Sequence, residues 1–144
     1  MIAIGTNVLL RYLLADDAIQ TAKATNIINS SEKILVTDVV LVETLWTLKG
    51  KKYQASKEDL VSVVESLFKE PHIVFEDGAT VWRALHDFRL SVPVKVGSKN
   101  KSADFSDALI VNKAQTIAKK LQEPLDGIYT FDVAARALEG TKEP

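Results

Sequence analysis

Short β-branched runs alternate along the chain with longer stretches of helical periodicity, and this alternation limits the possible folds more than any other feature. The strand-like runs, rich in Ile and Val, occupy residues 2–4, 34–37, 73–75 and 128–130. Helical spacing of apolar residues predicts helices over residues 7–14, 18–29, 38–49, 57–69, 78–89, 103–121 and 133–138. Such alternation favours an α/β fold, with a mostly parallel sheet of about four or five short strands and helices on both faces.

The length and composition predict a single domain over residues 1–144. A chain of 144 residues has the usual size of one domain, and 47% hydrophobic with 26% charged residues is typical of a globular protein. No repeat or low-complexity tract interrupts it. The polar segment 91–102 is expected to be a loop that joins two helices.

Charge and cysteine content exclude several classes of function. The net charge of −1 gives no overall attraction to phosphates, so any binding of nucleic acid must depend on a local patch. The absence of cysteine excludes disulfides and thiolate metal sites. No apolar stretch approaches the ~18 residues of a membrane-spanning helix, and no signal peptide is visible, so we expect a cytoplasmic protein.

Glu43 is the first carboxylate that the predicted fold makes conspicuous. Its helix, residues 38–49, is apolar nearly all round and is therefore predicted to be buried. An ionised carboxylate is costly to bury unless it is paired or binds a metal. A gap to solvent or a lysine partner would also account for Glu43.

Three further acids lie at positions where a site could form. Asp104 and Asp107 stand one turn apart in the helix 103–121, and Asp107 heads a predicted core stripe of Ile110, Val111, Ala114, Ile117, Ala118 and Leu121. Asp132 follows the strand 128–130. The alternatives are that acids in a first turn complement the helix dipole and that Asp132 is an N-cap.

These four carboxylates come from elements that the topology brings to one edge of the sheet, where ligands bind in open parallel sheets. Oxygen ligands without cysteine or paired histidine suit Mg²⁺ or Mn²⁺ and argue against structural zinc. Such a cluster suits hydrolysis of phosphodiesters, because the metal generates a nucleophile and stabilises the charged transition state.

Four motifs, "IGTNVLLRYLLADD", "TDVVLVETLWTL", "ADFSDALIVNKA" and "YTFD", together resemble the PIN-domain ribonucleases, and within them the VapC-type toxins of bacterial toxin–antitoxin pairs. The resemblance runs from residue 2 to about 136. It implies a PIN-like three-layer fold and a Mg²⁺- or Mn²⁺-dependent endoribonuclease that forms a homodimer and is held in check by a small VapB-type antitoxin. The resemblance assigns Glu43, Asp107 and Asp132 to the acidic positions of the site and makes Asp104 an additional acid. It assigns Thr6, Asn7 and Thr130 to the supporting polar positions.

Gly5 departs from the family pattern, which begins "DTNVLLRYL" and so has Asp at this position. Loss of a group that only orients a ligand typically costs about 10- to 100-fold in metal affinity or activity. The sequence therefore predicts normal folding with weak metal binding and poor cleavage. Natural divergence and a substitution that attenuates a harmful toxin both account for Gly5. The local alternative is a strand-to-helix turn that needs a positive φ.

Features of the sequence also bear on other classes of function. A PIN fold that no longer cleaves could bind RNA or an antitoxin. A nucleotide-binding domain is disfavoured, since neither G-x-G-x-x-G nor G-x-x-x-x-G-K-[ST] follows a strand. A phosphoacceptor domain of the receiver type would place Asp16 and Asp17 in its site, but both follow a helix rather than a strand and are interpreted as solvated turn residues.

Basic and aromatic side chains give weaker signals. Lys95, Lys99 and Lys101 precede Asp104 and could guide an RNA backbone, although a solvated loop is the simpler interpretation. The same two interpretations apply to Lys49, Lys51 and Lys52. Trp46 and Trp82 lie on apolar helical faces and are predicted to be core residues rather than base-stacking platforms.

Overall fold

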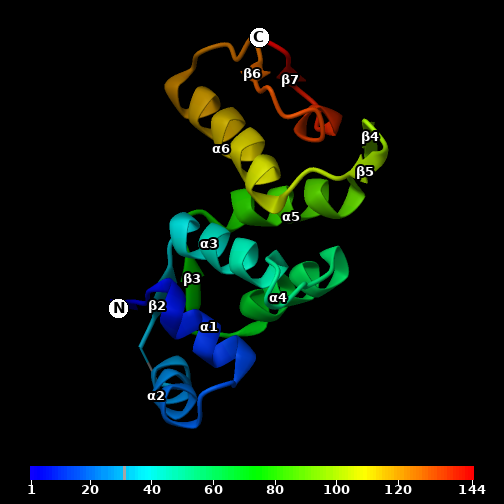
Figure 1. The fold of residues 1–144 in the computed structure, drawn as a ribbon. Helices are drawn as coiled ribbons and strands as arrows, with labels where there is room; N and C mark the ends of the chain where they lie inside the picture. Colours follow the sequence, from blue (N-terminus) through cyan, green and yellow to red (C-terminus); the bar gives the residue numbers. More distant parts are fainter. Residues whose placement is uncertain (31) are drawn as a thin grey trace. The chain divides into compact units, whose positions relative to one another are not determined.

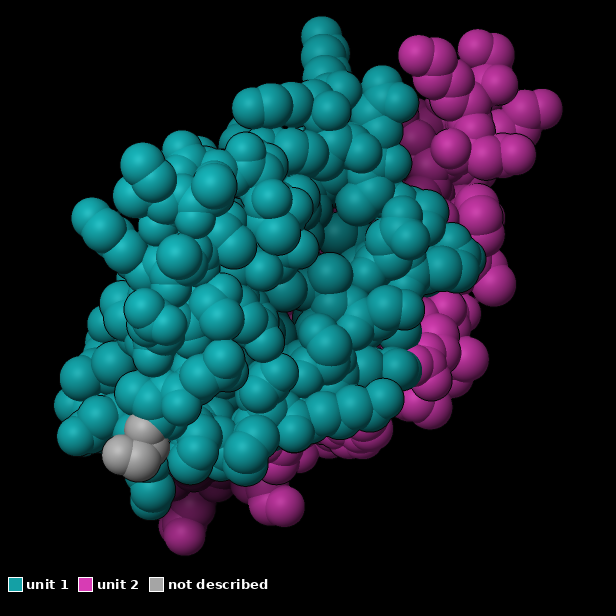
Figure 2. All heavy atoms as spheres, turned by 90° about the horizontal axis from the view of Figure 1, so that it is seen from below, with its two compact units in different colours: residues 1–78 teal, residues 79–144 magenta. Residues whose placement is uncertain are grey.

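The computed structural model describes residues 1–30 and 32–144 and shows a mixed α/β fold with a parallel sheet (Figure 1). The chain divides into two compact units, Met1–Gly78 (unit 1) and Ala79–Pro144 (unit 2), which Figure 2 colours separately. Within the described ranges, no helix combines the length and the apolar character needed to cross a membrane.

Unit 1 is built on a three-stranded parallel sheet in the order β1 (Ile2–Ala3), β2 (Ile34–Val36) and β3 (Ile73–Phe75). Each connection between neighbouring strands carries two helices: α1 (Thr6–Leu14), α2 (Ala18–Ile28), α3 (Asp38–Lys49) and α4 (Lys57–Lys69) (Figure 1). Parallel strands require such crossovers, because a tight turn joins only antiparallel strands. The starts of α1 and α3 therefore follow directly on neighbouring strands.

The core of unit 1 forms between the central strand and the helices. Ile34 of β2, Leu9 of α1 and Leu41 of α3 are fully buried. Complete burial of a leucine side chain contributes about 1.5–3 kcal/mol each relative to exposure. This packing fixes where α1 and α3 begin with respect to the sheet.

Unit 2 consists of two packed helices and two small strand pairs. The helices are α5 (Gly78–Leu90) and α6 (Phe105–Leu121), and the other elements are β4 (Val94–Val96), β5 (Lys99–Lys101), β6 (Ile128–Tyr129), the 3₁₀ turn η1 (Ala135–Ala137) and β7 (Thr141–Lys142). The rings of Phe88 and Phe105 meet edge to face at 6.0 Å and join α5 to α6. Strand β6 pairs in parallel with β7.

The α/β class and the parallel sheet are confirmed, and α3 and α4 have the predicted bounds. Among the described residues, the sheet has three strands rather than four or five, because the predicted strand at residues 128–130 forms β6, which pairs with β7 instead. The segment 91–102 is not a plain loop, because β4 and β5 form an antiparallel hairpin. Its turn contains Gly97 at φ +64°, the left-handed conformation that two-residue hairpin turns require. Residues 133–138 form only the short η1 turn, so the prediction of an α-helix there was wrong.

The predicted core stripe of α6 was also partly wrong. Ile110, Ile117 and Leu121 are exposed, and the buried residues of this helix are Phe105, Ala108, Leu109, Val111 and Asn112. Apolar residues occur on more than one face of α6, so their spacing predicts a helix without telling which face is covered.

Helix α3 is not buried all round, which corrects a second expectation. Its buried side is formed by Leu41, Thr44, Leu45 and Leu48. Val39, Glu43 and Trp46, spaced by four and three residues, lie exposed on the other side. Trp46 and Trp82 are 73% and 52% exposed, so neither is the core residue that the sequence predicted.

Helix α4 begins with a reciprocal pair of bonds that can be tested directly. The Asp59 backbone N–H donates to the Ser56 hydroxyl at 3.1 Å, and the Ser56 N–H donates to the Asp59 carboxylate at 2.9 Å. The bond from the Ser56 backbone lowers the pKa of Asp59. This carboxylate therefore favours the folded state above its unfolded pKa, and the contribution is lost as the pH falls through the lower folded value.

We predict that Ser56→Ala lowers the free energy of unfolding by about 1 kcal/mol, because one helical N–H loses its acceptor. Urea denaturation at neutral pH measures the change. Ser66→Ala in the same helix is the matched control, since the Ser66 hydroxyl only donates to the Val63 carbonyl. An equal loss in both variants would contradict the capping role.

Candidate active site

Unit 1 positions the carboxylate of Glu43 against the start of α1. The Thr6 hydroxyl donates to Glu43 Oε2 at 2.5 Å, across 37 residues of sequence. Thr6 is the first residue of α1, and Glu43 lies in the second turn of α3. Helix α3 starts where the Thr37 hydroxyl accepts the N–H of Val40 at 3.4 Å. Local capping and the order of the strands thus bring these two side chains together.

Glu43 faces a cavity and is exposed, so it is not the buried charge that the sequence predicted. The cavity has a volume of about 580 Å³ and is lined by Gly5, Thr6, Asn7, Val8, Leu10, Glu43, Trp46 and Thr47. Four of the positions that sequence analysis selected in this unit therefore share one cavity. Trp46 also lines it, and sequence analysis missed this role because helical spacing alone does not reveal which side is exposed.

The backbone of Gly5 does not require a glycine. Its φ of −87° and ψ of 168° are extended values that any residue adopts, so the explanation by positive φ was wrong. A Cβ placed on Gly5 would meet nothing within 4 Å. Gly5 is the N-cap of α1 without a side chain to cap it. The position therefore has room for an aspartate beside Glu43.

Unit 2 positions Asp104 and Asp107 at the start of α6. Asp104 is the N-cap, and its backbone N–H donates to Asp107 Oδ2 at 2.8 Å. Both side chains are half-buried. Asp107 therefore takes part in capping its own helix, a role that the sequence did not predict, and the same bond fixes the direction of its carboxylate.

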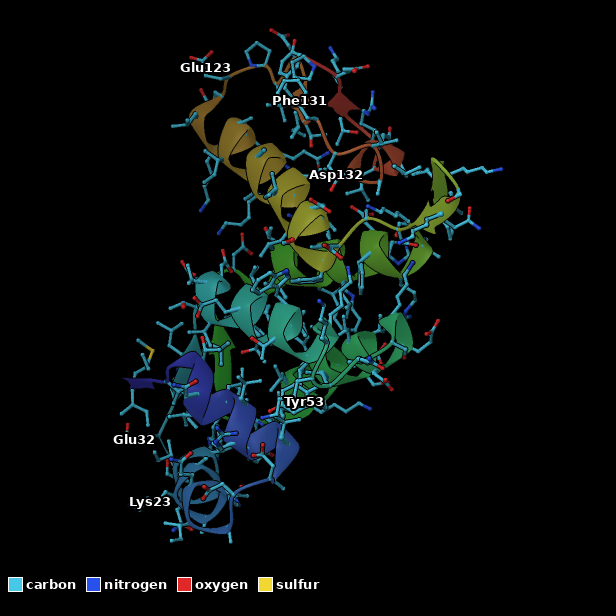
Figure 3. The ribbon with its side chains drawn as sticks, viewed as in Figure 1. Lys23, Glu32, Tyr53, Glu123, Phe131 and Asp132 are labelled. Carbon is cyan, nitrogen blue, oxygen red and sulfur yellow. The ribbon has the colours of Figure 1, made fainter. Side chains whose placement is uncertain are left out.

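Asp132 and Thr130 form a second local arrangement in unit 2, on the segment after β6 where Figure 3 labels Asp132. Asp132 Oδ1 accepts the N–H of Ala134 at 2.8 Å and that of Ala135 at 3.4 Å. The N–H of Asp132 donates to the Thr130 hydroxyl at 3.0 Å. Asp132 is thus an exposed cap of the turn that leads into η1.

The three lysines near Asp104 are exposed, but they do not form one strip. In the hairpin, Lys99 pairs with Val96 and Lys101 with Val94, which places these two lysines on one face. Lys95 lies between the two valines in sequence and so points to the opposite face. An RNA backbone that binds along this face of the hairpin could therefore contact Lys99 and Lys101 but not Lys95.

The cavity of unit 1 offers the donor types that a hard divalent cation prefers. Glu43 supplies a carboxylate, and Thr6 and Asn7 supply neutral polar groups. Within the described parts of either unit, no group of three or more Asp, Glu or His side chains gathers around one point. The donor types in this cavity are those of a hard divalent cation, although Glu43 is the single carboxylate among its lining residues, and the open position at Gly5 is where the cavity would gain a second one.

Comparisons with known proteins identify the family. A sequence model of the family described as "PIN domain" matches residues 2–133. Among solved structures, the chain is similar to the VapC20 toxin of Mycobacterium tuberculosis, described as cleaving the sarcin–ricin loop. The identity is 15%, the alignment covers 95% of this chain and 94% of that chain, and the TM-score is 0.40. No curated protein matches the chain.

We predict that Gly5→Asp folds normally and keeps the free energy of unfolding within about 0.5 kcal/mol, because Asp and Gly differ little as N-caps. Thermal and urea denaturation measure this. Gly5→Asn is the matched control, since it has the same shape without the charge that would repel Glu43. A loss of several kcal/mol in both variants would show that position 5 does not accommodate a side chain.

Proposed function

Because the chain belongs to the PIN domain family, we propose that it is a metal-dependent endoribonuclease of the VapC toxin type, weakened by Gly5. The observation that carries this proposal is the cavity in which Glu43, held by Thr6, lies beside the open position of Gly5. Sequence motifs in VapC order support the toxin type.

The proposed site carboxylates are Glu43 in unit 1 and Asp104, Asp107 and Asp132 in unit 2. Thr6, Asn7 and Thr130 are the supporting polar residues. The family match continues across the boundary between the two units, which supports one functional domain over residues 1–144.

Local hydrogen bonds fix the direction of the proposed ligands before any metal binds. Glu43 accepts the Thr6 hydroxyl, Asp107 accepts the Asp104 N–H, and Asp132 accepts the Ala134 N–H. Each hydrogen bond already restricts the rotamers of its carboxylate, so less side-chain entropy is lost when a metal binds. The chemistry that Mg²⁺ or Mn²⁺ supplies when bound is activation of the attacking water and stabilisation of charge on the phosphate.

Gly5 weakens this site by removing one carboxylate from the cavity of Glu43. Fewer anionic ligands attract a divalent cation less strongly, and even the loss of a group that only orients a ligand costs about 10- to 100-fold in affinity or activity. The same proposal includes the partners of a VapC-type toxin: an RNA substrate, a small VapB-type antitoxin that binds the chain, and a second copy of the chain in a homodimer.

The second candidate function is a module that binds RNA or an antitoxin without cleaving. Gly5 favours this candidate, because the cavity of unit 1 contains only the carboxylate of Glu43. The two candidates differ in whether restoring a carboxylate at position 5 restores cleavage.

The test is cleavage of a mixed tRNA and rRNA substrate with Mn²⁺ by the chain itself, Gly5→Asp and Gly5→Asp/Asp107→Asn. We expect Gly5→Asp to cleave about 10- to 100-fold faster than the chain itself. The double variant should be inactive, while its asparagine oxygen still accepts the Asp104 N–H and keeps the start of α6 intact. Gly5→Asn controls for the side chain without the charge.

If Gly5→Asp remained inactive on all RNAs while folded, the nuclease proposal would fail for this chain. Binding of RNA or a partner without a product would then support the non-cleaving module.

A further inference from the structure

Trp46 is the most exposed large aromatic side chain of unit 1, at 73%. It follows Glu43 by three residues on α3, a spacing that places the two side chains next to each other on the helix surface. An indole in contact with water loses a large hydrophobic contribution that burial would give. Its position beside the proposed site suggests that a ligand covers it.

Trp46 separates the carboxylate of Glu43 from a basic group. With Thr47 it lines the cavity of about 580 Å³ that contains Glu43 and Thr6. The same two residues line a second cavity of about 360 Å³ together with Lys49 and Gly50. A ligand that extends over the indole would therefore reach from the proposed site to Lys49.

The chain that follows α3 adds further positive charge. Lys51 and Lys52 are exposed in the turn after Lys49. The Lys52 ammonium lies 5.2 Å from the ring centroid of Tyr53, which Figure 3 labels, so this turn holds a cation in place on an aromatic face. Exposed aromatic rings beside a basic track are the surface that binds single-stranded nucleic acid, because bases stack and phosphates meet the charges.

We propose that Trp46 is a positioning residue on which one base of a single-stranded RNA substrate stacks, with Lys49, Lys51 and Lys52 meeting the RNA backbone beyond it. The inference rests on the proposed function, since it assigns the substrate side of the cavity that contains Glu43. It corrects the sequence interpretation of Trp46 as a core residue.

RNA fits this surface better than a protein partner does. A protein would bury the indole within an apolar patch, and exposed Val39 on the same helix side offers some apolar area. However, the cavity beside the indole contains Glu43, Thr6 and Asn7, and its other side carries Lys49. Stacking tolerates such polar surroundings, and the lysines are complementary to phosphates.

Tryptophan fluorescence tests the proposal, because the chain contains only Trp46 and Trp82. Trp82→Phe leaves Trp46 as the reporter, and Trp46→Phe leaves Trp82, an exposed tryptophan of unit 2, as the matched control. The chain is titrated with a fluorescently labelled single-stranded oligoribonucleotide. Quenching of the tryptophan emission reports contact with the RNA, and the anisotropy of the label reports binding. We expect the RNA to quench Trp46 and to leave Trp82 unchanged.

Affinity measured on the same RNA provides the second readout. Trp46→Leu should weaken binding about 5- to 150-fold, the range that corresponds to one lost base–aromatic stack. Trp46→Phe should retain most of the affinity, since a phenyl ring still stacks. Trp82→Leu should bind as the unchanged chain does. Rescue by Phe and not by Leu distinguishes stacking from a merely structural role.

Three outcomes would overturn the inference in distinguishable ways. RNA that binds equally to Trp46→Leu, without quenching Trp46, would refute stacking and leave the proposed nuclease intact. Quenching of Trp46 by a co-expressed antitoxin and not by RNA would assign the surface to a protein. RNA that neither binds nor is cleaved, even by Gly5→Asp, would refute the proposed function as well.

Discussion

Parallel pairing of β1 with β2 is the constraint on which the rest of the proposed site depends. It makes α1 and α3 start after neighbouring strands, so that Thr6 at the first residue of α1 reaches Glu43 in the second turn of α3. Burial of Leu9 and Leu41 holds the two helices against the sheet. A short hydroxyl–carboxylate bond then sets the direction of Glu43 toward a cavity. Core packing and the chemistry of the site are therefore linked through one pair of helices.

Gly5 occupies a position at which the scaffold does not need a glycine. The extended backbone and the free space around a Cβ show that the fold places no demand for glycine at the end of β1. The three acids of unit 2, in contrast, each take part in local structure: Asp104 and Asp107 begin α6, and Asp132 begins the turn into η1. Structural and catalytic roles are compatible for these acids, because a capping bond also orients a carboxylate. A substitution at position 5 is therefore expected to leave the fold unchanged and to act on the proposed site alone.

The sequence was sufficient to predict the α/β class, the parallel sheet and most helix bounds, since strand length and helical period are local signals. It was also sufficient to select Thr6 and Glu43, which the structure brings together. Exposure was the property it could not predict. Apolar spacing in α3 and α6 fits more than one face, so Trp46 and Ile110 were assigned to a core from which both are excluded. The hairpin around Gly97 was missed because its lysines and polar residues resemble a loop, although Val94 and Val96 alternate as strand residues do.

In the proposed function, a carboxylate at position 5 determines how tightly the site binds a divalent metal. Calorimetric titration of Mn²⁺ into the chain itself, Gly5→Asp and Gly5→Asn tests it most directly, without dependence on an RNA substrate. We expect Gly5→Asp to bind Mn²⁺ about 10- to 100-fold more tightly than the chain itself and Gly5→Asn to gain little. Adding Glu43→Gln to Gly5→Asp should remove most of the gain. Equal Mn²⁺ affinity of the chain itself, Gly5→Asp and Gly5→Asn would show that position 5 takes no part in metal binding.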